Sequence, residues 1–198
     1  MERVKTIIRV MVGAVALIMV LAAVYSVGVG PSFPICESTA NQYSPAVAHN
    51  SSLNKFLVVW ADIRGAGYGN DIYARAVNAD GSLFGLEFTI STAAMSQSDP
   101  AVAYNPSTNQ FLAVWHDSRL SPGTSPTVVG IYGRLVNLPS VDSPEFAIST
   151  YERCLRPALA YNSSANQFLV VWEDESSDDE RLAWLRNSRA HRMNTFGA

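Results

Sequence analysis

Apolar runs without polar interruption recur along this chain. Residues 56–60 read Phe-Leu-Val-Val-Trp, and closely similar runs stand at 111–115 and 168–172. A strand covered on one face alternates apolar and polar residues, whereas a continuous apolar run predicts a strand covered on both faces. The β-branched and aromatic content favours strands over helices. The pattern therefore predicts sheets that are stacked between neighbouring sheets.

These runs belong to a repeat that occurs three times. The spacing is 55 residues from Trp60 to Trp115 and 57 residues from Trp115 to Trp172. A fixed period of this size, built from strand-like pieces, is the signature of a repeat architecture. We expect the units at about 45–91, 100–149 and 157–198.

Each unit reads as four short strands separated by turn residues. In the first unit we expect the strands at 46–49, 55–61, 71–78 and 87–91. In the second unit we expect them at 101–104, 110–116, 130–136 and 145–149. The third unit is clear only at 158–161 and 167–173, with a looser match at 190–194. Residues 178–189 read equally as an irregular or helical tail, and Asp80-Gly81 predicts a tight hairpin turn.

The side chains of each unit change in size along its strands. The first strand carries small residues such as Ala46 and Ala48, whereas the third carries charged and aromatic residues such as Tyr73 and Arg75. This order suits sheets that converge on an axis, and four-stranded sheets stacked radially form the β-propeller. We predict an all-β fold, a β-propeller with about three four-stranded blades in a partial ring, preceded by an N-terminal hydrophobic helix. A two-sheet sandwich has room for the same strands but gives no reason for the repeat.

Residues 32–36 align with the end of the first unit's fourth strand, because Phe33 and Phe88 both lie 12 residues before the proline that opens the next unit. We expect an orphan fourth strand there, which would complete a blade with three strands of the last unit. Closed propellers have roughly 4–8 blades. Three alternatives stay open: a fragment of a longer gene product, self-association of two copies into a ring, or an open arc with exposed end sheets.

The repeat resembles those of known propellers. The second unit reads Pro-Ala-Val-Ala-Tyr-Asn from Pro100, followed by Gln-Phe-Leu-Ala-Val-Trp-His-Asp-Ser-Arg and Ile-Tyr-Gly-Arg. This pattern is similar to the TolB-like and sialidase-like propeller repeats of secreted bacterial and archaeal proteins, over about residues 33–173. The resemblance implies the architecture. It implies no activity, because the chain lacks the Ser-x-Asp-x-Gly-x-Thr-Trp box of sialidases and the Gly-His element of WD40 repeats.

The N-terminus carries a targeting segment. A basic flank at Arg3, Lys5 and Arg9 precedes an uncharged apolar run at 10–29. This run, at about 1.5 Å per residue, spans about 30 Å, the thickness of a bilayer core. Its length favours a membrane anchor, and the small residues after it leave a cleaved signal peptide open. We expect residues 1–30 to be a signal-anchor or signal peptide, and 31–198 to be a membrane-tethered or secreted domain.

Composition excludes several other classes. The formal net charge of −3 gives no basic field, so we expect no nucleic-acid partner. The two cysteines, Cys36 and Cys154, are too few for a disulfide framework, and their non-equivalent places in the repeat predict no bridge between them. No residue set has the spacing of a metal, cofactor or phosphate site, and we expect none.

The motif Trp-x-Asp ends the second strand of every unit, and an arginine follows two residues later in the first two units. The residues concerned are Asp62, Arg64, Asp117, Arg119 and Asp174. One interpretation is a ring of charges at one mouth of the propeller that binds a glycan or a cation. The other, favoured by recurrence, is a brace in which the aspartate caps the turn and the arginine pairs with an acid such as Asp71.

Three further positions are candidates. His116 stands where the other units have Ala61 and Glu173, but one imidazole alone makes no site. Asn50 and Asn162 open Asn-Ser-Ser sequences that match the N-glycosylation pattern, although such residues are also common in turns.

These patterns favour a non-catalytic extracytoplasmic module, a binding or scaffold protein whose ends engage a glycan or a protein. The alternative is part of a secreted propeller enzyme such as a glycosidase, so enzyme activity stays an open question. Acids that belong to one unit and converge on the mouth would indicate an enzyme. Acids repeated in every unit would indicate a brace.

Overall fold

The structure is a computed structural model that describes residues 30–65, 69–121, 129–141, 143–150, 153–174 and 187–194. The chain divides into two compact units, Met1–Phe33 and Pro34–Ala198. Every regular element of the described residues is a β-strand and lies in the second unit. The predicted N-terminal helix and the apolar run at 10–29 lie outside the described residues. No helix that is long and apolar enough to cross a membrane is found among the residues described.

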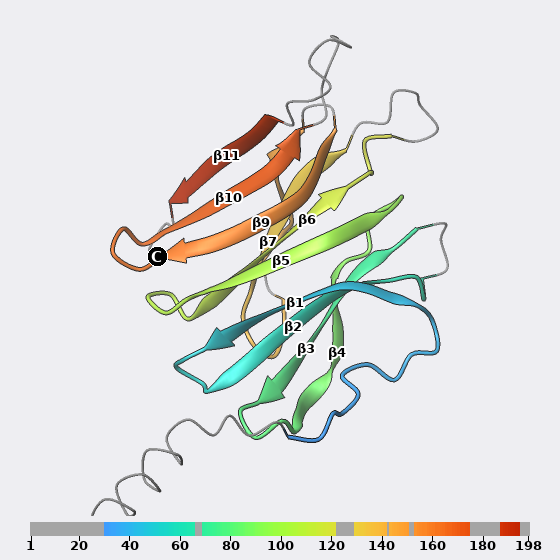
Figure 1. The fold of residues 1–198 in the computed structure, drawn as a ribbon, viewed down its shortest axis with the longest axis vertical. Helices are drawn as coiled ribbons and strands as arrows, with labels where there is room; N and C mark the ends of the chain where they lie inside the picture. The colour runs from blue at the N-terminus through green and yellow to red at the C-terminus, as the bar shows by residue number, and fades with distance from the viewer. Residues whose placement is uncertain are drawn as a thin grey trace, which may run out of the picture. The chain divides into compact units, whose positions relative to one another are not determined.

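The strands form three antiparallel sheets that follow one another along the chain (Figure 1). The first sheet has the order β1 (Gln42–Asn50), β2 (Lys55–Asp62), β3 (Asp71–Asn78) and β4 (Leu83–Ser91). The second has the order β5 (Gln97–Asn105), β6 (Gln110–Asp117), β7 (Gly130–Val136) and β8 (Phe146–Ser149). The third, in the described residues, has three strands, β9 (Cys154–Asn162), β10 (Gln167–Asp174) and β11 (Asn187–Asn194), with β10 in the middle.

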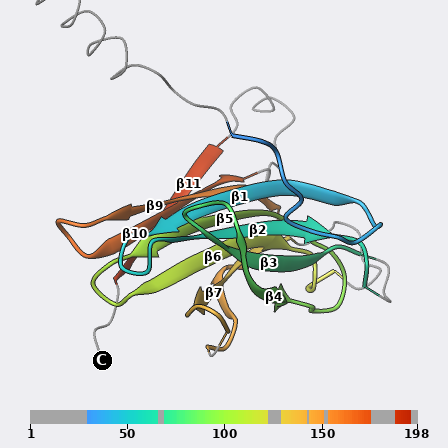
Figure 2. The same ribbon diagram turned by 90° about the horizontal axis from the view of Figure 1, so that it is seen from below.

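The three sheets pack face to face, with one core in each seam. The first core joins the first and second sheets through residues that include Leu57, Val59, Ile72, Phe111 and Trp115. The second core joins the second and third sheets through residues that include Leu112, Val114, Ile131, Phe168 and Trp172. Figure 2 shows β1, β5 and β9 toward one side of the stack and β4 and β7 toward the other, and β5 contacts both β1 and β9.

The predicted double-sided burial is complete only in the second sheet. All five residues of the apolar run in β6, Phe111 to Trp115, are fully buried. In β2, the side chains of Phe56 and Val58 are only half-buried, and in β10 Leu169 is 46% exposed. The outer faces of the first and third sheets therefore carry apolar residues that no described sheet covers.

The first strand of each sheet begins earlier than the sequence predicts. We expected these strands to start after the prolines, but β1, β5 and β9 begin three residues before them. The pairing of each with its neighbour shifts register at this point, for example between Ser98 and Ala101. A β-bulge leaves one residue outside the ladder, so a proline without an N–H fits inside the strand.

Other strands agree closely with the prediction. β3 and β7 have the predicted bounds, and β11 confirms a third strand in the last unit, although it starts at Asn187 rather than 190. The hairpin between β3 and β4 turns at Asp80-Gly81, where Gly81 has φ of 87°. That conformation is accessible to glycine at little cost, which explains the Asp-Gly signal.

Residues 32–36 do not form the orphan strand that we predicted, because residues 30–41 contain no strand. Their alignment with the end of β4 is nevertheless visible in their contacts. Arg75 donates to the carbonyl of Ile35 at 3.0 Å, and the equivalent Arg134 donates to the carbonyl of Ile90 at 2.7 Å. Ile35 and Cys36 occupy the place of a strand end, but the described residues offer them no neighbouring strand to pair with.

Candidate functional site

The first Trp-x-Asp-x-Arg motif forms a closed cluster at the end of β2. The carboxylate of Asp62 is fully buried and accepts hydrogen bonds from the indole of Trp60 at 3.1 Å and from the backbone N–H of Arg64 at 2.8 Å. The guanidinium of Arg64 donates to the same carboxylate at 2.6 Å and pairs with Glu87. It also lies over the ring of Tyr73, 4.3 Å from the centroid.

The electrostatics of this cluster favour the ionised state of both partners. Burial raises the pKa of Asp62, but the hydrogen bonds from Arg64 and Trp60 outweigh it, so the pKa lies below its usual value. Hydrogen bonding to Asp62 raises the pKa of Arg64. By contrast, burial and the charge of Asp62 raise the pKa of Asp71. The expected Arg64–Asp71 pair is absent from the ion pairs of the described residues, where Glu87 takes that place.

The second motif reproduces the same geometry. Asp117 is fully buried and accepts from Trp115 at 2.8 Å, from the N–H of Arg119 at 2.8 Å, and from the Arg119 guanidinium at 2.6 Å. Arg119 pairs with Glu145 at 2.6 Å and lies over the Tyr132 ring at 4.0 Å. Each of these contacts corresponds to one in the first cluster. Such repetition is expected of a structural element that every sheet needs.

The third motif is described only in part. Asp174 is buried, but residue 176, which is serine where the other units have arginine, lies outside the described residues. Asp62, Arg64, Asp117 and Arg119 neutralise each other in pairs, which supports the bracing interpretation of these four.

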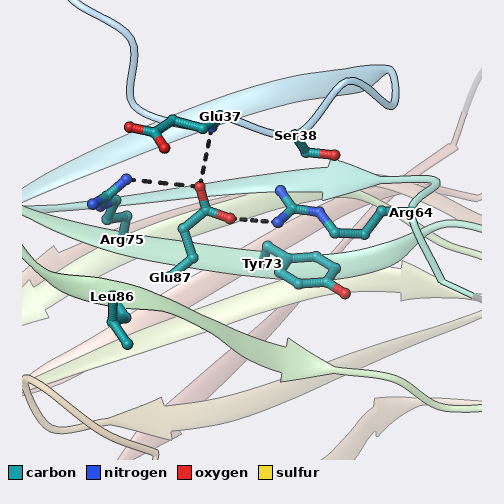
Figure 3. Close-up of a pocket in the computed structure, with 7 residues that line it drawn as sticks. All are labelled: Glu37, Ser38, Arg64, Tyr73, Arg75, Leu86 and Glu87. Carbon is teal, nitrogen blue, oxygen red and sulfur yellow. Dashed lines mark hydrogen bonds and ion pairs between the residues drawn. The ribbon is translucent and has the colours of Figure 1, made fainter.

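A pocket of about 420 Å³ adjoins the first cluster, between residues 37–38 and the strands β3 and β4 (Figure 3). Glu87 accepts from the N–H of Glu37 at 3.4 Å and lies 3.8 Å from Arg75. Figure 3 shows the guanidinium groups of Arg64 and Arg75 both directed at the carboxylate of Glu87. Of the two acids that line this pocket, Glu87 is thus already matched by two guanidinium groups.

The two glycosylation candidates differ in accessibility. Asn50 is 1% exposed, its Oδ1 accepts from the N–H groups of Ser52 and Leu53, and its Nδ2 donates to Asn109 at 3.0 Å. Attachment of a glycan to Nδ2 of Asn50 would therefore require this buried amide to become exposed. Asn162 is exposed, and its Oδ1 makes the same turn bonds.

The bulge of each first strand holds a different residue in the same backbone conformation. Ser44, Asp99 and Arg156 occupy equivalent positions, with φ of 49°, 48° and 48°. L-residues seldom adopt this left-handed conformation, which costs on the order of 1 kcal/mol or more. The repeated conformation belongs to the bulge, whereas the three side chains are specific to their units.

Ser44 and Asp99 contact each other, and Asp99 and Arg156 each contact a residue near the end of a second strand. Asp99 accepts from the hydroxyl of Ser44 at 2.6 Å, so the pair bridges the first two sheets. The other oxygen of Asp99 lies 3.4 Å from Nδ1 of His116. In the third sheet Arg156 donates to Glu173 at 2.8 Å. These five residues form what we call the bulge cluster, at the end of the sheets where β2, β6 and β10 finish.

Burial and the nearby acids shift the pKa of His116 in opposite directions. Burial lowers its pKa, Arg156 lowers it further, and the acids Asp99 and Asp117 oppose the shift without cancelling it. Its side chain is 16% exposed, against 35% for Asp99 and 57% for Arg156. The imidazole is therefore biased toward the neutral form, and it lies beside the more exposed carboxylate of Asp99.

Sequence reasoning found His116 as a unique polar residue but missed its partners. The signal was present in the residue before each repeat proline, which is serine, aspartate and then arginine. A strand that starts after the proline leaves this position in a connection, so the predicted strands do not include it. Among the described residues, no group of three or more His, Cys, Asp or Glu side chains is arranged to hold a metal ion.

No protein-family model matches this chain, and no curated protein matches it by sequence. Among solved structures, it is similar to a GH43_12 protein retrieved from capybara gut metagenome, with a TM-score of 0.51 and 12% sequence identity. The chain has a β-propeller-like fold. The match covers 81% of this chain but 30% of the other, so this chain spans under a third of that protein's length. At this identity the likeness concerns the fold alone.

Proposed function

We propose that this protein is an extracytoplasmic binding module that takes a polyhydroxylated ligand, such as a glycan, at the end of the sheets that carries the bulge cluster. The observation that supports the proposal most is the contrast between equivalent positions. The brace residues are the same in the first two units, whereas Ser44, Asp99 and Arg156 differ at one shared backbone site. A purely structural role would require no such difference.

Exposed apolar side chains gather at the same end. Tyr43 directly precedes Ser44 and is 45% exposed. Other exposed apolar residues of the connections at this end are Ile63, Met95 and Leu120. Binding faces combine a few placed polar groups with apolar and aromatic surface, and tyrosine is suited to both kinds of contact.

The chemistry of the bulge cluster suits hydroxyl groups. A carboxylate such as Asp99 accepts hydrogen bonds, a guanidinium such as Arg156 donates them, and neutral His116 can do either. Adjacent hydroxyls of a sugar offer a donor and an acceptor side by side. The half-exposed Asp99 and Arg156 leave room for such contacts, in contrast to the fully buried Asp62 and Asp117.

A glycan array probed with the purified full-length chain tests this proposal. We expect a defined subset of glycans to bind, with affinity reduced about tenfold or more by Asp99→Ala, because a lost charged hydrogen bond costs about 1.5–3 kcal/mol. Asp80→Ala is the matched control, since Asp80 is an exposed aspartate in the β3–β4 turn at the opposite end. Equal binding by wild type, Asp99→Ala and Asp80→Ala would contradict the proposal.

A second candidate is part of a glycoside hydrolase, and the structural likeness to the GH43_12 protein favours it. Asp99 beside His116 is an acid specific to one unit, which is the feature expected of an enzyme. A panel of chromogenic glycosides, assayed with the wild type and with Asp99→Asn, separates the two candidates. Turnover that Asp99→Asn abolishes would establish the enzyme, and binding without turnover would favour the module.

Location and ring completeness are further parts of the proposal. Residues 10–29 are proposed to export the chain and to hold it at the membrane or release it after cleavage, which fusion of an export reporter after residue 30 would test. The three sheets are proposed to be blades of a partial ring.

A further inference from the structure

The first and third sheets each leave one apolar face uncovered by described residues. In the second sheet Val102 is 9% exposed and Leu112 is fully buried. The equivalent Val47 of the first sheet is 60% exposed, and the equivalent Leu169 of the third sheet is 46% exposed. The apolar runs of β2, β6 and β10 predict that each of these strands is covered on both faces. Among the described sheets, only the middle one is covered in this way.

The two uncovered faces are the two halves of a seam that this chain already contains. Val47 lies on the outer face of the first sheet. The equivalent face of the second sheet packs on the first sheet, where Val102 and Phe111 enter the first core. Leu169 lies on the outer face of the third sheet. The equivalent face of the second sheet packs on the third sheet, where Leu112 and Val114 enter the second core. The open face of the third sheet therefore has the composition to cover the open face of the first.

A ladder of asparagines shows the same incompleteness at its ends. Asn50 donates to Asn109 at 3.0 Å across the first seam, and Asn105 donates to Asn166 at 3.1 Å across the second. The next donor in this series is Nδ2 of Asn162, which meets no acceptor in the described residues. The acceptor at the other end is Asn54, whose Oδ1 is hydrogen-bonded to His49 at 3.2 Å, within the same hairpin of the described residues.

Residues 35–36 mark where the missing neighbour of the first sheet would end. Arg75 donates to the carbonyl of Ile35, and Arg64 donates to Sγ of Cys36 at 2.8 Å. In the second sheet the equivalent arginines reach Ile90 and Ser91, which end the first sheet. The pocket of Figure 3 lies beside this segment, on the face where a preceding sheet would sit.

From these matches we infer that a second copy of this chain covers the open faces, with the third sheet of each copy packed on the first sheet of the other. Asn162 of one copy then donates to Asn54 of its partner, and residues 32–36 lie where a fourth strand would extend the partner's third sheet. Two such heterologous seams close by twofold rotation, which gives a ring rather than a filament.

Light scattering and sedimentation of the full-length chain, at concentrations from about 1 to 100 µM and in constant detergent, test this inference. The variants Val47→Arg and Leu169→Arg each place a charge in one half of the proposed seam, at positions exposed in the single chain. We expect the wild type to dimerise and each variant to dissociate at least about tenfold more readily, because a buried unpaired charge opposes association. Urea denaturation verifies that both variants stay folded.

Mixing the two variants gives the decisive result. Val47→Arg retains an intact third sheet and Leu169→Arg retains an intact first sheet, so the mixture contains one native seam and should form a heterodimer that neither variant forms alone. A wild type that stays monomeric over the whole range would overturn the inference. So would a dimer that survives either single change, or a mixture that restores nothing. Glycan binding is measured separately, so failure here is distinguishable from failure of the proposed function.

Discussion

The brace clusters and the bulge cluster lie within a few residues of each other along the same strands, yet they follow opposite rules. At the brace, Asp62 and Asp117 are fully buried and make the same three hydrogen bonds in two sheets. At the bulge, the backbone is the same in three sheets and the side chains differ. In this protein the recurring side chains belong to the framework, and the varying side chains on a recurring backbone mark the place where we propose that a ligand is bound.

The largest expected effect separates these two clusters by stability. Asp117→Ala should lower the free energy of unfolding by about 3–5 kcal/mol, because it leaves the Trp115 N–H and the Arg119 guanidinium without their buried acceptor. Asp99→Ala should change it by less than about 1 kcal/mol, since Asp99 is partly exposed and its pairs are weak. Urea denaturation of both variants measures the difference. Equal losses would remove the distinction between brace and bulge.

A smaller effect tests whether the asparagine ladder stabilises the seams. Asn105→Ala should cost about 1–3 kcal/mol, because Asn105 is fully buried and bonds both its own turn and Asn166. Asn162→Ala removes only the turn bonds of an exposed residue and should cost about 1 kcal/mol or less. The comparison is made by urea denaturation at about 1 µM, where an association between copies contributes least. If Asn162→Ala were the more costly change, the seam bonds would not be the stabilising ones.

The smallest effect concerns pH and the bulge cluster. Because the pKa of His116 in the folded chain lies below the usual 6.5, the unfolded chain binds the extra proton first as pH falls. Stability should therefore decrease from pH 7 to pH 5, by at most about 1.4 kcal/mol per pH unit. The charged groups that influence His116 are Asp99, Asp117 and Arg156.

The control for this prediction is His116→Gln, which keeps a polar side chain of similar size but cannot titrate. Thermal unfolding of both proteins at pH 5, 6 and 7 should show a shallower pH dependence for the variant. A wild-type curve that is flat, or one that is steeper in the variant, would show that the imidazole is not held in its neutral form.

The sequence was sufficient for the sheets because hydrophobic burial and turn chemistry are local signals. The apolar run at 111–115 and the Asp80-Gly81 turn each predicted the element that the structure contains. The orphan strand failed because residues 32–36 carry the pattern of a strand end, while pairing needs a partner that the pattern does not specify. The bulge cluster was missed for a different reason, since a left-handed residue before proline leaves no trace in hydrophobic periodicity.

The candidate site shows the same division. That Asp62 caps the turn after its strand follows from spacing alone, but the choice of Glu87 over Asp71 as the partner of Arg64 depends on how β4 lies beside β3. The contact between Ser44 and Asp99 joins residues 55 positions apart and requires the packing of two sheets. Interactions within one strand end were predictable, and those across a seam were not.

The hydrogen bonds from Arg75 to Ile35 and from Arg134 to Ile90 also indicate where a repeat unit that could be moved as a whole begins along the chain. The first and second sheets are each secured to the few residues that come before their own first strand, so a segment excised at the proline would leave its guanidinium without a carbonyl to bind. A cassette suitable for duplication, deletion or grafting onto another scaffold therefore starts about ten residues upstream of the proline, at positions 35 and 90. Insertions that respect these borders would lengthen the array and keep its joints intact, which gives such repeats a simple route to gain or lose a member.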